Sequence, residues 1–193
     1  MNAAQTTEKQ VNIEQLAEKL KAAKMVNSGN YVSPNTRGVV VVKSTKMQNG
    51  YKGSSAIFEF EILESEGKAA REGISEGKAH KKGEEFSVVL NLSGGGVKED
   101  MGYNNLKTNM AAIAASLRLP DPVNDGVGLA KAAFTADGKP SAICRGVKLA
   151  YDTLDKPAKD GKPPRSFPKF SPIPQTDEDL EAMKADLDKR KPL

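Results

Sequence analysis

The chain is poor in the side chains that most enzyme active sites use. Its 193 residues contain no tryptophan, a single cysteine (Cys144) and a single histidine (His80), and only 5% of them are aromatic. A lone cysteine excludes a disulfide within the chain, and a lone histidine excludes a metal site built from several histidines. We therefore predict a protein that is not an enzyme and that holds neither a metal ion nor another cofactor.

Long apolar segments are absent too. No apolar run approaches the roughly 20 residues that cross a bilayer, and no secretory signal pattern is present. We expect a cytoplasmic protein that does not associate with a membrane. The net charge of +4 is mildly basic, which permits a polyanionic partner without requiring one.

Three isolated features could carry chemistry, and each has a simpler interpretation. His80 lies in the charged stretch 78–82 and is predicted to be a surface side chain. Cys144 precedes Arg145, whose charge would favour a thiolate, but its place in a predicted strand favours a buried thiol. The glycine run 94–96 lacks the spacing and the Ser/Thr of a phosphate-binding loop, so we interpret it as part of a flexible, glycine-rich joint over 93–102 before the helix.

The order of the apolar patterns predicts the fold. Three strand-like runs come first, an apolar helix pattern follows, and two more strand-like runs come last. The predicted strands are 38–47, 54–63, 85–93, 143–151 and 165–173, and the predicted helix is 105–117. This is the order of the OB-fold, a five-stranded, partly open Greek-key barrel. We predict an α+β, mainly β, OB-fold-like barrel whose helix plugs one end between strands three and four.

Local patterns agree with this layout. Asn49-Gly50 predicts a hairpin between the first two strands. In the second strand the apolar residues alternate over 56–62 and are predicted to face inward, while Glu59 and Glu61 face water. Pro168 places the fifth strand at an edge. Residues 64–84 are charged and without a period, which predicts a long connection.

The chain divides into three predicted regions. Residues 1–30 form an N-terminal amphipathic helix or arm, 31–173 the OB-fold-like domain, and 174–193 a C-terminal helix and tail. The apolar sides of the terminal helices, Ile13 to Leu20 and Leu180 to Leu187, can pack on their own barrel or on a second copy of the chain.

Basic and aromatic side chains gather at the two loops that form the walls of an OB-fold groove. Such a groove suits a single strand, because any base can stack on an aromatic ring and every phosphate attracts a cation. The predicted contact residues are Lys43, Lys46, Tyr51, Lys52, Lys148, Tyr151, Lys156, Lys159, Lys162, Arg165 and Phe167. The simpler interpretation is that these lysines aid solubility and that the aromatic residues belong to the core. Glu59 and Glu61 would also repel phosphate from the sheet face, so a ligand must cross the loops or the barrel binds no nucleic acid.

Four segments carry a resemblance to a known family: GVVVVK at 38–43, AIFEFEIL at 56–63, FSVVL at 86–90 and GVKLAY at 146–151. Taken in this order, the chain from 31 to 173 resembles the small single-stranded-DNA-binding OB-fold proteins of bacteriophages. The resemblance is one of topology. It implies that the protein coats single strands during DNA replication or recombination, in the host cytoplasm, without catalysis and often cooperatively.

Two other functions fit the same pattern. The barrel could be a structural or assembly protein, such as a virion component, that uses its terminal helices as interaction modules. An oligosaccharide-binding module is the third possibility, which the lack of tryptophan makes less attractive.

Overall fold

The computed structural model describes residues 32–50, 53–157 and 165–189. The predicted N-terminal helix lies outside the described residues, as do four of the predicted contact residues: Tyr51, Lys52, Lys159 and Lys162.

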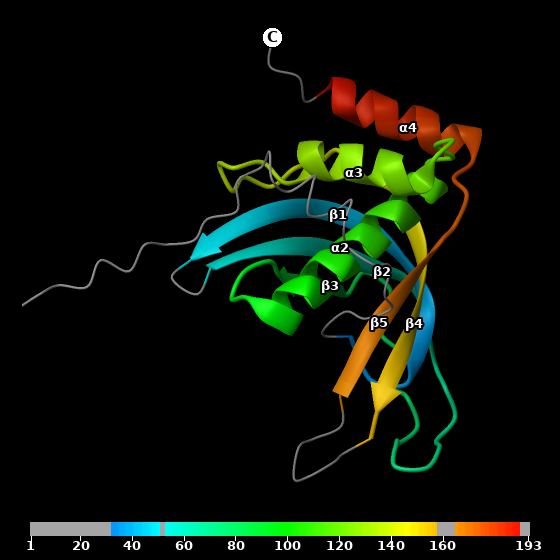
Figure 1. Ribbon diagram of the computed structural model, residues 1–193. Helices are drawn as coiled ribbons and strands as arrows, with labels where there is room; N and C mark the ends of the chain where they lie inside the picture. The colour runs from blue at the N-terminus through cyan, green and yellow to red at the C-terminus, as the bar shows by residue number, and fades with distance from the viewer. Residues whose placement is uncertain (1–31, 51–52, 158–164, 190–193) are drawn as a thin grey trace, which may run out of the picture.

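A five-stranded antiparallel sheet forms the body of the protein (Figure 1). Its strands are β1 (Thr36–Gly50), β2 (Gly53–Gly67), β3 (Glu85–Asn91), β4 (Lys148–Lys156) and β5 (Arg165–Pro172), and their spatial order is β3-β2-β1-β4-β5. The five predicted strands are thus confirmed, with β5 at an edge. β4 begins later than predicted, because residues 143–147 turn and the Gly146 amide donates to the Val42 carbonyl at 2.9 Å.

The sheet is not closed into a barrel, which corrects the prediction. β3 and β5 form its two edges, and helix α2 (Gly96–Ser116) packs against both of them and against β4. The two halves of the sheet meet through side chains instead. The Phe60 ring of β2 lies 4.6 Å from the Phe170 ring of β5, and the Phe86 ring of β3 lies 6.4 Å from the Tyr151 ring of β4. The sheet is therefore strongly curled around an aromatic core.

The inner face of the sheet follows the predicted alternation. Four residues of β2 are fully buried: Ala56, Phe58, Phe60 and Ile62. The two glutamates between them, Glu59 and Glu61, lie on the opposite, outward face, because successive side chains of a strand point to opposite sides.

Helix α2 begins earlier than the sequence pattern predicts. It starts at Gly96, so most of the segment predicted as a joint is its first turns. Positive φ angles at the glycines 94–96 make the turn from β3 into the helix. α3 (Pro122–Ala133) covers its other side, where a Cβ on Gly126 would lie 2.9 Å from the Ala111 amide nitrogen. Packing on two sides explains why α2 is buried nearly all round in its second half.

The predicted C-terminal helix is α4 (Asp177–Asp188), and its N-terminal half is tied to its own chain. Thr176 and Asp179 form a capping box. Asp179 also accepts a 2.7 Å ion pair from Lys148, and Asp177 accepts one of 2.7 Å from Arg118. Met183 packs against the core beside Gly146. Among the described helices, none combines the length and the apolar content that a membrane crossing requires.

Candidate nucleic-acid interface

The lysines of β1 are engaged with carboxylates of the neighbouring strands. Lys43 pairs with Glu61 and Glu85, and Lys46 pairs with Glu59 at 2.8 Å. The hydrogen bonds to Glu85 and Glu61 raise the pKa of Lys43, and those from Lys46 and Ser44 lower the pKa of Glu59. These pairs neutralise part of the acidic charge that the sequence places on the sheet face, so a phosphate would have to displace a carboxylate to reach either lysine.

Two other predicted contact residues have structural partners. The Lys148 ammonium holds Asp179 of α4, and its hydrogen bond lowers the pKa of that carboxyl. Tyr151 is only 2% exposed, and its hydroxyl lies 2.7 Å from the Ser65 hydroxyl. The prediction that Tyr151 is a stacking platform is therefore corrected, because a ring inside the core offers no face to a base.

The outward face of the β4–β5 hairpin brings together an exposed apolar side chain, an aromatic ring and lysines. Leu154 pairs directly with Phe167 across the strands, which places both side chains on one face. Leu154 is 49% exposed, and the Lys156 ammonium lies 5.6 Å from the centre of the Phe167 ring. Lys169 is exposed two residues along β5 from Phe167. We call Leu154, Lys156, Phe167 and Lys169 the hairpin patch.

Arg165 is placed at this end of the hairpin by its backbone. It pairs with Lys156 at the last rung of the β4–β5 ladder. The ladder therefore brings three of the predicted contact positions, Lys156, Arg165 and Phe167, to one place.

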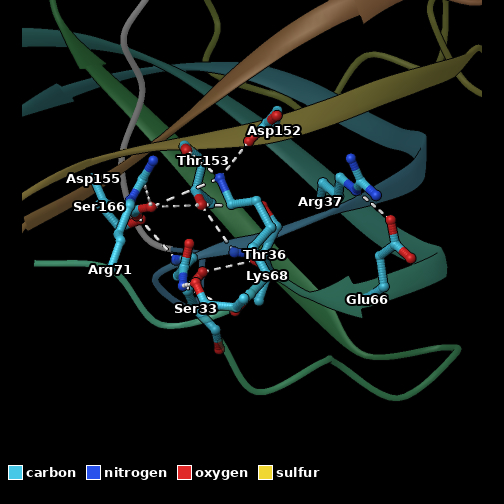
Figure 2. A network of polar contacts seen from close by, with 12 residues as sticks. Ser33, Thr36, Arg37, Glu66, Lys68, Arg71, Asp152, Thr153, Asp155 and Ser166 are labelled. Carbon is cyan, nitrogen blue, oxygen red and sulfur yellow. Dashed lines mark hydrogen bonds and ion pairs between the residues drawn. The ribbon is translucent and has the colours of Figure 1, made fainter. Parts of the chain in front are cut away.

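A buried carboxylate fixes the base of this hairpin (Figure 2). The Asp155 side chain is 2% exposed. It accepts hydrogen bonds from the backbone amide of Asn35 at 3.0 Å, from the Arg71 guanidinium at 2.8 Å and from the Ser166 hydroxyl. The Lys68 ammonium lies 3.7 Å away and also binds Asp152 at 2.5 Å. These contacts join the start of β1, just before Thr36, with β4, β5 and the connection after β2 at one point.

A shallow groove adjoins the network on the outward face of β1, β4 and β5. Its volume is ≈ 320 Å³, and small side chains leave it open: Gly38, Ala150 and Ser171 are among its lining residues. Arg37 and Glu66 form an ion pair on its rim.

Sequence reasoning missed Leu154 and Lys169. The signal was present in the alternation along β4 and β5: since Tyr151 and Thr153 point inward, Leu154 must point outward. The predicted contact set was selected on charge and aromaticity, which passed over an exposed leucine.

His80 and Cys144 have structural roles. The His80 ring accepts a hydrogen bond from the Ser33 amide through Nε2 at 3.0 Å, and its Nδ1 lies 2.9 Å from a Glu84 carboxylate oxygen. Cys144 is fully buried, and burial raises the pKa of its thiol to about 12. Across residues 32–50, 53–157 and 165–189, no cluster of His, Cys, Asp and Glu could hold a metal ion.

Comparisons of the chain with protein-family models, curated proteins and solved structures found no match.

Proposed function

We propose that this protein binds single-stranded DNA without catalysing a reaction, and that the hairpin patch is its main contact surface. The observation that carries the proposal is an exposed leucine beside a half-buried aromatic ring, with the Lys156 ammonium over that ring. A base that stacks on Phe167 would displace the Lys156 ammonium from the ring, and Lys156 and Lys169 would then attract phosphates. Stacking combined with cationic side chains is how single strands are held without sequence preference.

We also infer that the fold is an OB-fold variant opened between β3 and β5. Its strand order, β3-β2-β1-β4-β5, and a helix inserted between β3 and β4 are what an OB-fold would show with that pairing released. In an OB-fold the β4–β5 loop forms one wall of the ligand groove, and the hairpin patch lies at the base of that loop. A role in phage DNA replication or recombination is the setting that this proposal implies.

The ion pairs of β1 sharpen the proposal. Lys43 and Lys46 form ion pairs with Glu59, Glu61 and Glu85. The single-stranded DNA should therefore follow the β4–β5 side of the sheet and avoid the β2–β3 side. α4 contacts its own chain through Asp177, Asp179 and Met183. These described contacts do not favour the alternative of an assembly protein whose terminal helices dock on other copies.

Fluorescence anisotropy with labelled oligo-dT tests the proposal. Phe167→Ala should weaken binding by about 1–3 kcal/mol, the usual contribution of a stacking aromatic residue. Lys156→Ala should lower the slope of log K against log salt by about 0.7, as expected for one lost phosphate contact on a single strand.

A matched control is Val123→Ala, which truncates an exposed apolar residue of α3 and should leave affinity unchanged. The wild-type protein should bind oligo-dT more tightly than a duplex of the same length. Absence of binding to oligo-dT at low salt would overturn the proposal.

A further inference from the structure

Many basic side chains of the sheet and of the connection after β2 form ion pairs with carboxylates. Exposed lysines that form no such pair are therefore the better candidates for contacts with phosphates. Lys43, Lys46, Lys68, Arg71 and Lys148 each contact a carboxylate. In contrast, the segment 77–83 of the β2–β3 connection contains Lys78, Lys81 and Lys82, and no acidic residue. All three lysines are exposed, and none forms an ion pair with the part of the chain that the structure describes.

The connection, residues 68–84, is tied to residues 33–35, which lead into β1. The side-chain amide nitrogen of Asn35 lies within hydrogen-bond distance of the carbonyls of Lys68, Ala69 and Ser75, at 2.9, 2.8 and 3.0 Å. Two further hydrogen bonds, from the Ser33 amide to His80 Nε2 at 3.0 Å and from the His80 amide to Ser65 at 3.0 Å, fix the segment that carries the three lysines.

The same connection lies against the hairpin. Arg71 binds Asp155 at 2.8 Å, and a Cβ on Gly73 would lie 2.9 Å from the Pro157 side chain. The connection and the end of the β4–β5 hairpin therefore lie at the same end of the molecule (Figure 1). The Ser33 amide binds His80, and the backbone amide of Asn35, two residues further on, binds Asp155. The segment that carries the three lysines is therefore anchored at the end of the molecule where the β4–β5 hairpin ends.

We propose that Lys78, Lys81 and Lys82 form a second phosphate-binding surface, which extends the hairpin patch and holds the continuing backbone of the same single-stranded DNA. This inference rests on the proposed function and adds a contact region to it. Its physical basis is that exposed lysines without carboxylate partners can release bound counterions from phosphates, whereas lysines already paired with carboxylates contribute little.

The experiment compares two triple variants by anisotropy with oligo-dT over a range of salt concentrations. The loop variant is Lys78→Gln, Lys81→Gln and Lys82→Gln. The control variant is Lys98→Gln, Lys131→Gln and Lys189→Gln, which changes the net charge equally at exposed lysines on α2, on α3 and at the end of α4. Matching the net charge separates local contacts from the overall field of the protein.

We expect the loop variant to lower the slope of log K against log salt by about 2, since each lost contact to a single strand removes roughly 0.7. The control variant should keep the wild-type slope, and both should keep the wild-type melting temperature. Equal slopes for the two variants, with wild-type binding intact, would overturn this inference and leave the hairpin patch standing. If the wild-type protein itself does not bind, the proposed function fails.

Discussion

Asp155 is the residue that joins the hairpin patch to the rest of the molecule. Burial alone would raise the pKa of this carboxyl. Hydrogen bonds from Ser166 and from the Asn35 amide, together with the charge of Lys68, outweigh burial and hold that pKa below its ordinary value near 3.8. Because the pKa is lower in the folded protein than in the unfolded chain, the ionised carboxylate stabilises the fold above that ordinary value. The contribution is lost as the pH falls through the folded-state pKa.

We therefore expect Asp155→Asn to lower the free energy of unfolding by about 1–3 kcal/mol at pH 7, the cost of disrupting a buried charged hydrogen-bond network. The difference from wild type should shrink at pH 3, below the ordinary value of 3.8, because the unfolded chain then binds protons that the folded carboxylate does not. Urea unfolding at both pH values measures it. Asp177→Asn is the control, since the Asp177 side chain is 89% exposed in its pair with Arg118 and should contribute less than about 1 kcal/mol. Equal stability of Asp155→Asn and wild type at pH 7 would contradict the role assigned to this network.

Cys144 gives a second prediction at this scale. With its pKa raised to about 12 by burial, the thiol should not react with a disulfide reagent such as DTNB at pH 8 while the protein is folded. One equivalent should react at once in denaturant, because the unfolded thiol regains its ordinary pKa. Absorbance of the released thiolate measures both rates. Rapid reaction under native conditions would show that the cysteine is not buried.

Among the elements, α4 depends on its first turn. Its described contacts include the ion pair of Asp179 with Lys148 of β4 and the ion pair of Asp177 with Arg118, just after α2. The capping box holds this turn in place. Thr176→Ala should cost about 1 kcal/mol and accelerate hydrogen exchange of the α4 amides, with the amides of β1 and β2 unchanged. Thr135→Ala, which removes only a hydrogen bond in an exposed turn, should leave α4 exchange as in wild type. Equal exchange in α4 for both variants would contradict the cap's role.

The elements themselves could be predicted where a local pattern defines them. Alternation over 56–62 predicted β2 and its inner face, because a strand with one buried face has to repeat every two residues. The start of α2 was missed, because Gly96 and Gly102 weaken the helical pattern in its first turns, which are largely exposed. Gly102 is there because it packs against the Asn91 carbonyl of β3, a long-range contact that local propensity does not report.

The candidate site could be predicted only in part, for a related reason. Lys156, Arg165 and Phe167 follow from the hairpin, which is a local structure. The pairing of Lys43 with Glu61 and Glu85 depends on register, and β1 shifts its register against β2 twice, between Val39 and Val40 and between Val42 and Ser44. Bulges of this kind decide which charges meet. The contacts of Asn35 and Asp155 depend on long-range placement that no local pattern reports.

At the scale of the whole molecule, the two faces of β5 have different roles: one face stabilises the fold, and the other carries the proposed binding surface. Successive residues of β5 face opposite sides, so Phe170 points into the core and Phe167 points outward. Phe170 is 4% exposed and stacks on Phe60 at 4.6 Å, one of the contacts that hold the two halves of the open sheet together.

We predict opposite effects of truncating the two rings. Phe170→Ala should lower the free energy of unfolding by about 3–5 kcal/mol, because it leaves a cavity between β2 and β5. Phe167→Ala should cost far less stability, since its ring is only half-buried, yet it should weaken binding to oligo-dT by about 1–3 kcal/mol. Urea unfolding and anisotropy, applied to both variants, give the four values. If Phe170→Ala retained wild-type stability, the aromatic contacts would not be what keeps the open sheet curled. If Phe167→Ala bound oligo-dT as wild type does, the exposed ring would have no part in binding, and the ligand would have to follow another face of the sheet.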